Sequence, residues 1–262
     1  MDILDRIYAQ SKEDVAKRRK KVRITDFRSF EAYEHLRKSL FEALQRDENT
    51  PVRIIAEIKK ASPSQGIIRN DFNPEAIAED YIQNGAAAIS VLTDEPFFQG
   101  SLEYLQKVAD ISPIPVLRKD FIHDFYQIEE ARAHGADAIL LIATMLDPVH
   151  LSELHHAANE IGLECLVECY DETDLSRISY KEVRILGVNN RDLRTFKVDV
   201  HRGIEMLKTA PKGVVTVSES GLNSPDDLKL LHDQNINAAL IGESFMREIS
   251  PGKALSNILT YF

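Results

Sequence analysis

From residue 52 onward, short apolar runs alternate with longer stretches in which apolar and polar residues follow a helical spacing. Apolar runs of this length are typical of buried strands, and the amphipathic stretches are typical of helices that cover them. The pattern therefore predicts eight strand–helix units. The predicted strands are "VRIIAEI" (52–58), "AAAISVLT" (86–93), "IPVLRK" (114–119), "DAILLIA" (137–143), "LECLVE" (163–168), "VRILGVN" (183–189), "VVTVSES" (214–220) and "NAALIGE" (237–243).

Helix boundaries are marked in the stretches between these strands. "NPEAIAEDYIQNG" has Asn73 as its N-cap, Pro74 at the first helical position and Gly85 at its end. "SPDDLKLLHDQN" begins in the same way with Ser224 and Pro225. Because Asn or Ser before Pro favours a helix start and Gly favours a helix end, one helix is predicted after each strand.

An internal repeat supports this count. "NGAAAISVLT", "HGADAILLIA" and "QNINAALIGE" superpose on Gly85, Gly135 and Asn235, which lie 50 and 100 residues apart. Apolar strands separated by helices indicate a parallel sheet, and right-handed crossovers then allow an open doubly wound sheet or a closed barrel. The GxGxxG dinucleotide fingerprint does not occur, and roughly 210 residues suit a compact barrel. The predicted fold is an α/β (β/α)8 TIM barrel.

Ahead of the first strand, residues 1–50 are predicted to form a helical extension of the same domain, so that one domain spans residues 1–262. The apolar residues of this segment recur at helical spacing. They are Ile3, Ile7, Phe27, Phe30, Tyr33, Leu36 and Leu40. We expect the extension to cover the mouth of the barrel; packing under the barrel is the alternative.

Strand parity predicts which side chains enter the barrel, because every second residue of a strand faces the same side. In five strands the lumen-facing series begins with apolar residues and ends with a charge or an amide. Since the carboxyl ends of barrel strands meet at one mouth, these end residues are candidates for chemistry. They are Glu57, Lys59, Lys119, Glu168, Asn189 and Glu219.

Two interpretations without a catalytic role compete with this hypothesis. A charge at a strand end is often the first solvated residue of a loop, although five strands ending alike make coincidence a weak explanation. A buried ion-pair network that only holds the barrel together would need matched signs, whereas this set has three carboxylates and two lysines. The mixture suits proton transfer among groups with shifted pKa values.

A phosphate site is predicted after the seventh and eighth strands, in "SESGLNSPDD" and "ALIGESFMRE". Backbone N–H groups in these loops bind phosphate in many barrels, and Gly221 and Gly242 allow close approach. Either glycine alone is explained by turn chemistry. Arg191 in "NNRDL" and the turn "SPSQG" after the first strand could add donors.

Composition and charge narrow the class of protein. The chain of 262 residues is 44% apolar, enough for a large core, and has a net charge of −10. No apolar stretch approaches a membrane span of roughly 18 residues, and no secretory signal is recognisable at the N-terminus. We therefore expect a cytoplasmic protein that binds neither membrane nor nucleic acid. The basic run "KRRKKVR" (17–23) is interpreted as a solvated helix end or, alternatively, as an anion-attracting rim.

Cysteine and histidine patterns do not predict a metal site. On a strand, Cys165 and Cys169 would lie about 13 Å apart at ~3.3 Å per residue, beyond disulfide reach, so they are expected to be buried thiols. "HLSELHH" offers His150, His155 and His156 on a predicted helix away from the mouth, without a zinc-protease pattern. We expect surface histidines and no metal.

Six motifs, read in order, resemble one family. "EIKKASPSQG", "PVLRKDFI", "LVECYDETDL", "GVNNRDL", "VSESGL" and "LIGESFM" are similar to those of indole-3-glycerol phosphate synthases, over almost the whole chain and including the extension. The resemblance implies a barrel enzyme without a cofactor. It implies conversion of 1-(2-carboxyphenylamino)-1-deoxyribulose 5-phosphate, an anionic sugar phosphate, to indole-3-glycerol phosphate with loss of carbon dioxide and water, in tryptophan biosynthesis.

The resemblance also implies roles for single residues. Lys119 resembles the general acid, and Glu168 the catalytic carboxylate that acts as a base or stabilises a developing cation. Glu57 and Lys59 match a pair in which the carboxylate helps to remove a proton and the ammonium holds an anionic group or acts as a second acid. Asn189, Glu219 and Ser220 resemble the polar lining, Phe121 the contact to the aromatic ring, and Ser62, Arg191, Gly221 and Gly242 the carboxylate and phosphate ligands. Glu243 departs from the small residue often found there and is expected to point away from a phosphate.

Two rival functions stay open on sequence grounds. The nearer is another phosphate-binding barrel enzyme, such as a sugar-phosphate isomerase or an aldolase that forms a Schiff base on Lys119. The farther is a non-catalytic anion-binding barrel. The sequence does not define the oligomeric state, and a monomer is the working expectation.

Overall fold

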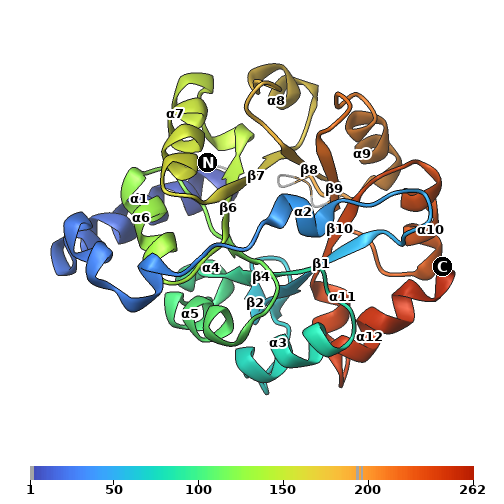
Figure 1. Ribbon diagram of the computed structural model, residues 1–262, viewed down its shortest axis with the longest axis horizontal. Helices are drawn as coiled ribbons and strands as arrows, with labels where there is room; N and C mark the ends of the chain where they lie inside the picture. The colour runs from blue at the N-terminus through green and yellow to red at the C-terminus, as the bar shows by residue number, and fades with distance from the viewer. Residues whose placement is uncertain (1–2, 193–194, 196) are drawn as a thin grey trace.

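The computed structural model describes residues 3–192, 195 and 197–262 and contains a closed parallel barrel of eight strands in the order β1-β10-β9-β8-β7-β6-β5-β4 (Figure 1). Each predicted strand is found; seven are shortened by one to three residues, and the strand predicted at 163–168 keeps its length and is shifted by one residue. The strands are β1 (Arg53–Ile58), β4 (Ala88–Leu92), β5 (Val116–Lys119), β6 (Ala138–Ile142), β7 (Glu164–Cys169), β8 (Ile185–Asn189), β9 (Val215–Glu219) and β10 (Ala238–Ile241). Chain neighbours pair in order, and β10 closes the barrel on β1.

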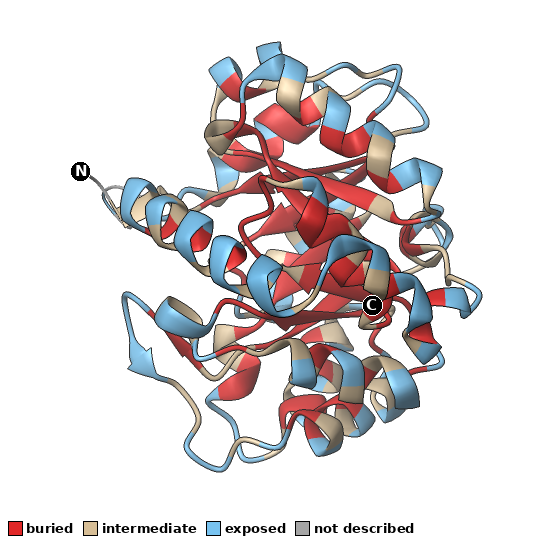
Figure 2. Ribbon diagram, turned by 90° about the vertical axis from the view of Figure 1, so that its left-hand side faces the viewer, coloured by how far each residue is buried: buried red, intermediate tan, exposed pale blue. Residues whose placement is uncertain are grey.

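Helices surround the barrel, so the strands are buried and the outward faces of the helices are exposed (Figure 2). The covering helices are α3 (Pro74–Gln83), α5 (Leu102–Ile111), α6 (Phe125–Ala133), α7 (Pro148–Glu160), α8 (Glu172–Arg177), α9 (Val200–Leu207), α10 (Pro225–Asp233) and α12 (Pro251–Ile258). The expectation of a single helix per strand is too simple. A hairpin of β2 (Ala61–Ser62) and β3 (Gly66–Ile67) follows β1, and α4 (Glu95–Phe98) and α11 (Glu243–Met246) are additional short helices. Single 3-10 turns follow β6 (Ala143–Met145) and α12 (Leu259–Tyr261).

The repeat has a backbone explanation. Gly85, Gly135 and Asn235 each follow the end of a helix with a positive φ, of 95°, 84° and 59°. The left-handed conformation ends the helix, and Gly and Asn adopt it at least cost. The repeated Gly or Asn therefore marks the turn that sends the chain into the next strand.

Two apolar layers confirm the predicted parity. Ile55, Leu117, Leu166 and Val217 pack in the cluster inside the barrel. Residues of the opposite parity, including both cysteines, pack outward against the helices. Cys165 and Cys169 are buried free thiols, as expected, and burial raises the pKa of each.

The N-terminal extension contacts both ends of the barrel, so the two expected positions are both occupied. Helix α1 (Ile3–Lys21) lies beside α6 and places Ile3, Leu4 and Ile7 at the mouth. Helix α2 (Leu40–Leu44) seals the opposite end, where Ser39 Oγ and the N–H of Phe41 donate to Glu164 at the start of β7, at 2.9 and 2.7 Å.

Between α1 and α2, the helical spacing of the apolar residues does not produce an α-helix. Residues 24–34 form the 3-10 turns η1 (Ile24–Ser29) and η2 (Glu31–Glu34), and Leu36, expected on an apolar helix face, is 94% exposed. Contacts with α6 override the helical spacing here, because Phe27 and Tyr33 pack in a cluster with Tyr126 and Ala133.

Candidate active site

A cavity of about 390 Å³ opens at the carboxyl ends of the strands. It is lined by all six strand-end residues and by all six predicted binding residues. They are Glu57, Lys59, Ser62, Lys119, Phe121, Glu168, Asn189, Arg191, Glu219, Ser220, Gly221 and Gly242. The structure therefore brings the predicted site residues together, and their chemical roles stay predictions.

Lys119, at the end of β5, lies between two carboxylates of the opposite barrel wall. Its Nζ is 3.2 Å from Glu168 Oε2 and 3.4 Å from Glu219 Oε2. Asn189 Nδ2 donates to the other oxygen of Glu168 at 3.4 Å, and Asn189 is level with Glu219 in the β8–β9 register. One ammonium, two carboxylates and an amide thus form a connected group across the lumen.

The pKa values of this group are pushed apart by burial and by neighbouring charge. Burial alone would lower the pKa of Lys119, but Glu168, Glu219 and Glu57 raise it above its ordinary value. Glu219 is 1% exposed, and neither of its carboxylate oxygens accepts a hydrogen bond from a described residue. Burial raises its pKa to about 8, against the pull of Lys119 and with the support of Glu168. Lys119 is therefore a stable cation, and Glu219 is a neutral acid near pH 7.

Glu57 and Lys59 form a second ion pair on β1 and the residue after it. Lys59 Nζ lies 2.5 Å from Glu57 Oε1. Burial raises the pKa of Glu57, but the positive charges of Lys59 and Lys119 outweigh this effect. The net pKa lies below the ordinary value, so this carboxyl is held ionised. Glu57 and Glu219 are thus two buried carboxyls of opposite protonation state, which is how one site can hold a base and an acid together.

Two glycines make room for the buried carboxylates. A Cβ at Gly187 would lie 2.2 Å from Glu219 Oε1, and a Cβ at Gly242 would lie 2.5 Å from Glu57 Oε1. A Cβ at either position would displace the carboxylate, so the two glycines leave the space that Glu219 and Glu57 occupy. Gly242 thereby has a packing role in addition to its predicted contact with phosphate.

The segment after β9 is held in an unusual backbone conformation. Ser220 has φ 69° and Gly221 has φ 77°. A positive φ costs a serine free energy, so other contacts must maintain it. Buried Asn190 supplies one, since its Nδ2 donates to the carbonyl of Ser220 at 2.9 Å and to Ser218 Oγ at 3.0 Å. Sequence reasoning missed Asn190 because its parity directs it away from the lumen.

Glu243 lines the cavity, which differs from the expectation that it points away. Arg247 donates to it at 3.1 Å and Arg191 lies 3.7 Å from it, so its charge is balanced. Arg247, one turn further along the chain, was not predicted. The two arginines leave net positive charge beside the segments that contain Gly221 and Gly242, which suits an anion.

The site also has an apolar wall, which the pattern of polar strand ends does not predict. Phe98 of α4 lies with its ring centroid 5.9 Å from that of Phe121, and Leu140 of β6 and Ile7 of α1 line the same cavity. Parity would have identified Leu140, which shares the lumen face of β6 with Ile142. Nothing in local spacing brings Phe98 or Ile7 to the mouth.

The basic segment 17–23 does not line this cavity. Arg18 and Arg19 pair with Glu130 and Asp124 near α6, and Arg23 pairs with Asp26 at 2.9 Å. The interpretation as a helix end on the outer surface is therefore the better one, and the expectation of a basic rim at the mouth is wrong.

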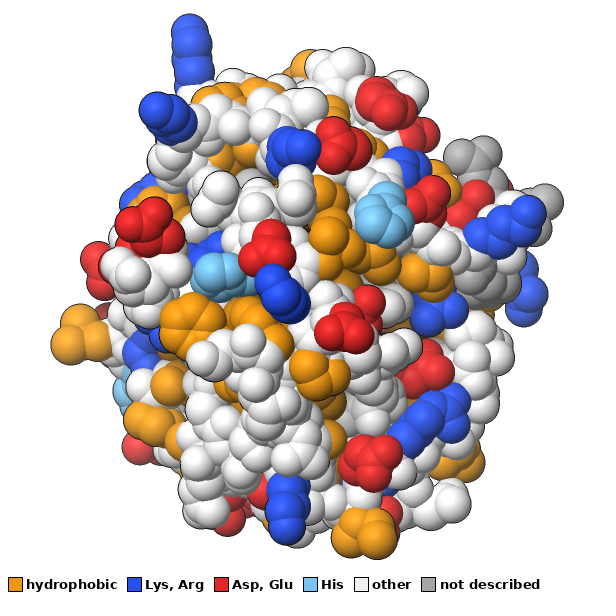
Figure 3. All heavy atoms as spheres, turned by 90° about the vertical axis from the view of Figure 1, so that its right-hand side faces the viewer, with side chains coloured by type: hydrophobic (Ala, Val, Ile, Leu, Met, Phe, Trp, Pro, Cys, Tyr) orange, Lys and Arg blue, Asp and Glu red, His pale blue; other side chains and the backbone are white. Residues whose placement is uncertain are grey.

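Metal, membrane and surface features add little to the site. Among the described residues no group of three or more His, Cys, Asp or Glu side chains is placed to hold a metal ion. Of the three histidines expected at the surface, His156 is exposed but His155 is buried on the inner side of α7, and His150 Nε2 lies 2.8 Å from the carbonyl of His123. No helix within the described ranges is long and apolar enough to cross a lipid bilayer. On the face drawn in Figure 3, acidic and basic side chains are interspersed.

The raised pKa of Glu219 predicts a pH-dependent stability. Between pH about 4.5 and about 8 the folded protein keeps a proton on Glu219 that the unfolded chain releases. The free energy of unfolding should therefore fall as pH rises through this window, by at most about 1.4 kcal/mol per pH unit. Glu219→Gln, which is always neutral, should remove this slope. Urea unfolding of both proteins from pH 5 to 8 checks the prediction, and parallel profiles would contradict it.

The fold and the site together define the class. Buried ammonium and carboxylate groups lie at the carboxyl ends of the barrel strands, beside the loops of Gly221 and Gly242, which suit an anion. This is the arrangement of a (β/α)8-barrel enzyme. Solved structures agree on the fold. The tryptophan synthase alpha-subunit from Pyrococcus furiosus (a D110A mutant) superposes with a TM-score of 0.60 at 13% identity, covering 80% of this chain and 98% of that one. KGPDC from Streptococcus mutans gives 0.61 at 13% identity, covering 80% and 96%.

Sequence comparison is more specific. The family model for indole-3-glycerol phosphate synthase matches residues 4–258. An indole-3-glycerol phosphate synthase of Salinibacter ruber is 48% identical over 98% of this chain and 95% of its own length. One from Campylobacter jejuni subsp. doylei is 45% identical over 98% of this chain and its whole length. The chain belongs to the indole-3-glycerol phosphate synthase family.

Proposed function

We propose that the protein closes the ring of 1-(2-carboxyphenylamino)-1-deoxyribulose 5-phosphate to give indole-3-glycerol phosphate, carbon dioxide and water, a step of tryptophan biosynthesis. The observation that carries the proposal is the Lys119 ammonium between Glu168 and Glu219, in a cavity with an apolar wall on one side and anion-binding groups on the other. The family membership supports the same reaction.

Three bond changes must be assisted. The ring carbon that bears the carboxylate attacks the ketone carbon, and the ketone oxygen takes up a proton as the carbon–carbon bond forms. Carbon dioxide then leaves with its bonding electrons returned to the ring. Finally the hydroxyl leaves as water while a neighbouring carbon loses a proton. The first and third steps need a proton donor at oxygen, and the third also needs a base.

Lys119 is proposed as the acid of ring closure. Its raised pKa keeps it protonated, and a positioned cation lowers the cost of charge that develops on the ketone oxygen. Glu168, which accepts from Lys119 and Asn189, is proposed to stabilise the cation at the ring nitrogen or to take the proton of the last step. Glu219, the buried neutral acid, is proposed to polarise the same group.

Glu57 and Lys59 are proposed to serve the dehydration side of the site. Glu57 is held ionised and is therefore available as a base, and Lys59, its ion-pair partner, is proposed to hold the substrate carboxylate or act as a second acid. The pH–rate profiles of single variants at Lys59, Lys119, Glu57 and Glu168 distinguish the acid from the base roles.

The two ends of the substrate are proposed to bind at opposite ends of the cavity. The aromatic ring is proposed to lie on Phe121 and Phe98. The phosphate is proposed to bind the backbone of Ser220, Gly221 and Gly242, with Ser62 and Arg191 as further anion ligands.

The protonation state of Lys119 argues against the Schiff-base aldolase. A lysine nucleophile needs a lowered pKa so that the free amine is present, whereas neighbouring glutamates, Glu168 foremost, raise the pKa of Lys119 and hold it as an ammonium. A reaction without a cofactor or metal, a monomeric state and a cytoplasmic location stay predictions, as does the absence of a nucleic-acid partner.

An assay for indole fluorescence with the carboxyphenylamino sugar phosphate tests the proposal. Fluorescence should rise, and carbon dioxide should be released in equal amount. Folded protein that binds the compound without turnover would favour the anion-binding barrel. A covalent adduct trapped by borohydride would favour the aldolase, and either result would overturn the proposal.

Asn190→Ala is expected to raise KM for the phosphate substrate about tenfold, with kcat changed by less than about threefold. The loss of a buried hydrogen bond releases the carbonyl of Ser220, and a tenfold change equals about 1.4 kcal/mol. Ser218→Ala is the matched control, since it removes the other acceptor of Asn190 and leaves the bond to Ser220. Steady-state kinetics on the three proteins checks the prediction, and equal KM values for both variants would contradict it.

A further inference from the structure

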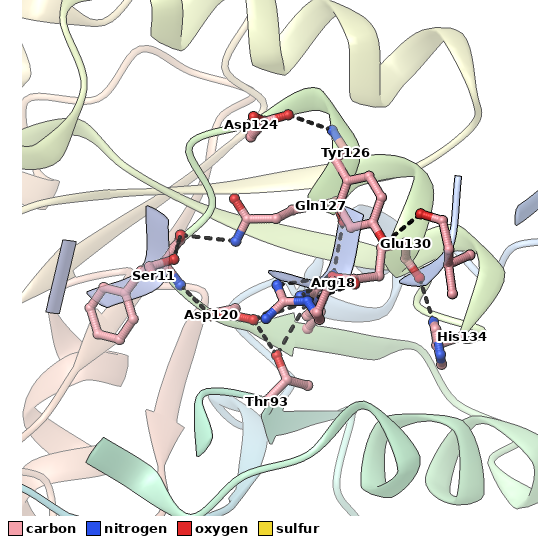
Figure 4. Close-up of polar contacts among 12 residues, drawn as sticks. Ser11, Arg18, Thr93, Asp120, Asp124, Tyr126, Gln127, Glu130 and His134 are labelled. Atoms are coloured by element: carbon pink, nitrogen blue, oxygen red, sulfur yellow. Dashed lines mark hydrogen bonds and ion pairs between the residues drawn. The ribbon is translucent and has the colours of Figure 1, made fainter. Parts of the chain in front are cut away.

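Behind Lys119, on the outer side of β5, lies a buried charged cluster that the proposed reaction does not use (Figure 4). Its centre is Arg118, which is fully buried. Arg118 donates to Asp120 Oδ2 at 2.8 Å, to Glu130 Oε2 at 2.9 Å and to the carbonyl of Gln127 at 2.9 Å. The cluster therefore ties the end of β5 to helix α6.

The cluster also fixes the backbone around the predicted acid. Asp120 Oδ1 accepts from the N–H of Phe121 at 2.8 Å, and Asp120 Oδ2 accepts from Thr93 Oγ1 at 2.6 Å. The N–H of Thr93 in turn donates to the carbonyl of Lys119 at 3.2 Å. Arg118, Asp120 and the carbonyl of Lys119 are thus held by Thr93, Gln127 and Glu130, which do not line the cavity.

Helix α1 joins the same cluster from the other side. Arg18 Nε donates to Glu130 Oε1 at 2.8 Å, and Arg18 donates to Glu130 Oε2 at 3.2 Å. Oε2 is also the oxygen bound by Arg118. A second link is made by Ser11, whose Oγ donates to the carbonyl of Phe121 at 3.3 Å. The helix that places Ile3, Leu4 and Ile7 at the mouth is therefore bound to the turn that presents Lys119 and Phe121.

We propose that Glu130 is a positioning residue, whose carboxylate couples the docking of α1 over the mouth to the placement of the β5 end that carries Lys119 and Phe121. The coupling follows from the shared oxygen, because loss of Arg18 removes one of the two arginines that fix the Glu130 carboxylate and leaves it held by Arg118 alone. A purely stabilising network would not require that one carboxylate serve both a mouth-covering helix and the residue next to Lys119.

Hydrogen exchange of the protein without substrate tests the coupling and does not depend on the proposed function. Arg18→Met should raise the exchange rates of α1 and of residues 119–127 about tenfold, which corresponds to about 1.4 kcal/mol. The segment after β9, residues 219–224, should keep its rates. Lys17→Met is the matched control. It removes one positive charge from α1, as Arg18→Met does, but Lys17 pairs with Asp14 of the same helix.

Kinetics then tests the positioning role, which rests on the proposed function. Arg18→Met should raise KM about tenfold with kcat within about twofold, and Glu130→Gln should also lower kcat about tenfold. The double variant should resemble Glu130→Gln alone, because Arg18 acts through Glu130. If Glu130→Gln does not fold, the comparison of Arg18→Met with Lys17→Met remains decisive.

Two results would overturn the inference. Faster exchange in α1 with unchanged exchange in residues 119–127 would show that Arg18 only anchors the helix. Effects of Arg18→Met and Glu130→Gln that multiply in the double variant would show that the two residues act independently. A protein without the proposed activity would still give the exchange result, so failure of the inference and failure of the proposed function are distinguishable.

Discussion

Lys119→Met is expected to lower kcat by about 10³-fold, which lies within the range of general-acid and electrostatic contributions. Methionine keeps most of the length of the side chain and removes the ammonium that bridges Glu168 and Glu219. Without the ammonium, no donor at this position neutralises the oxygen that gains charge during ring closure. Loss of the ammonium also leaves the charge of Glu168 unbalanced beside an anionic substrate, so KM should rise as well.

Lys60→Met is the matched control for this result. Lys60 follows Lys59 directly, has the opposite parity, and is absent from the lining of the cavity. Its replacement should change kcat and KM by less than about twofold, as expected for a surface substitution. Stopped or continuous fluorescence assays on folded proteins make the comparison. Near-normal turnover of Lys119→Met would remove the assignment of Lys119 as the acid.

Glu168→Gln is expected to lower kcat by about 10²-fold to 10⁴-fold, because the amide can neither take up a proton nor balance a cation. The substitution is nearly isosteric, and Asn189 and Lys119 keep an oxygen to contact, so the fold should persist. The pH–rate profile provides a second readout, since a limb that depends on a carboxylate should disappear from the variant.

Glu164→Gln separates catalysis from stability on the same strand. Glu164 lies at the opposite end of β7, where it accepts from Ser39 and the N–H of Phe41. Its replacement should lower the free energy of unfolding by about 1–3 kcal/mol while kcat stays near that of the parent. A loss of turnover in Glu164→Gln comparable to that in Glu168→Gln would contradict the assignment of function to the mouth.

The barrel and its polar mouth were predictable because both depend on simple periodicity. A strand has a period of two, so the residue type at its carboxyl end reports directly on the mouth, as Glu57, Lys119 and Glu219 show. Helix ends were predictable for a similar reason, since Gly85 and its equivalents satisfy a local backbone requirement. Local sequence patterns therefore predict the fold where each strand–helix unit has the same environment.

Other features depend on contacts between segments far apart in the chain. The spacing of Phe27, Tyr33 and Leu36 suggested a helix, but packing against α6 produced 3-10 turns and exposed Leu36. Asn190 and Arg118 face away from the lumen, so a search for lumen-facing charges passed over them. Their importance appears only when their partners, on other elements, are known.

The extension also has a consequence for the order in which the chain can assemble. Arg18 meets Glu130 across 112 residues of sequence, and Phe41 meets Glu164 across 123. On the ribosome the first forty or so residues are synthesised well before these partners. The delay is longer for β1, which can pair with β10 only near the end of synthesis. The nascent protein therefore carries apolar side chains such as Ile7, Leu40 and Leu44 without their final contacts for much of its synthesis. This interval is when a chaperone has most to protect.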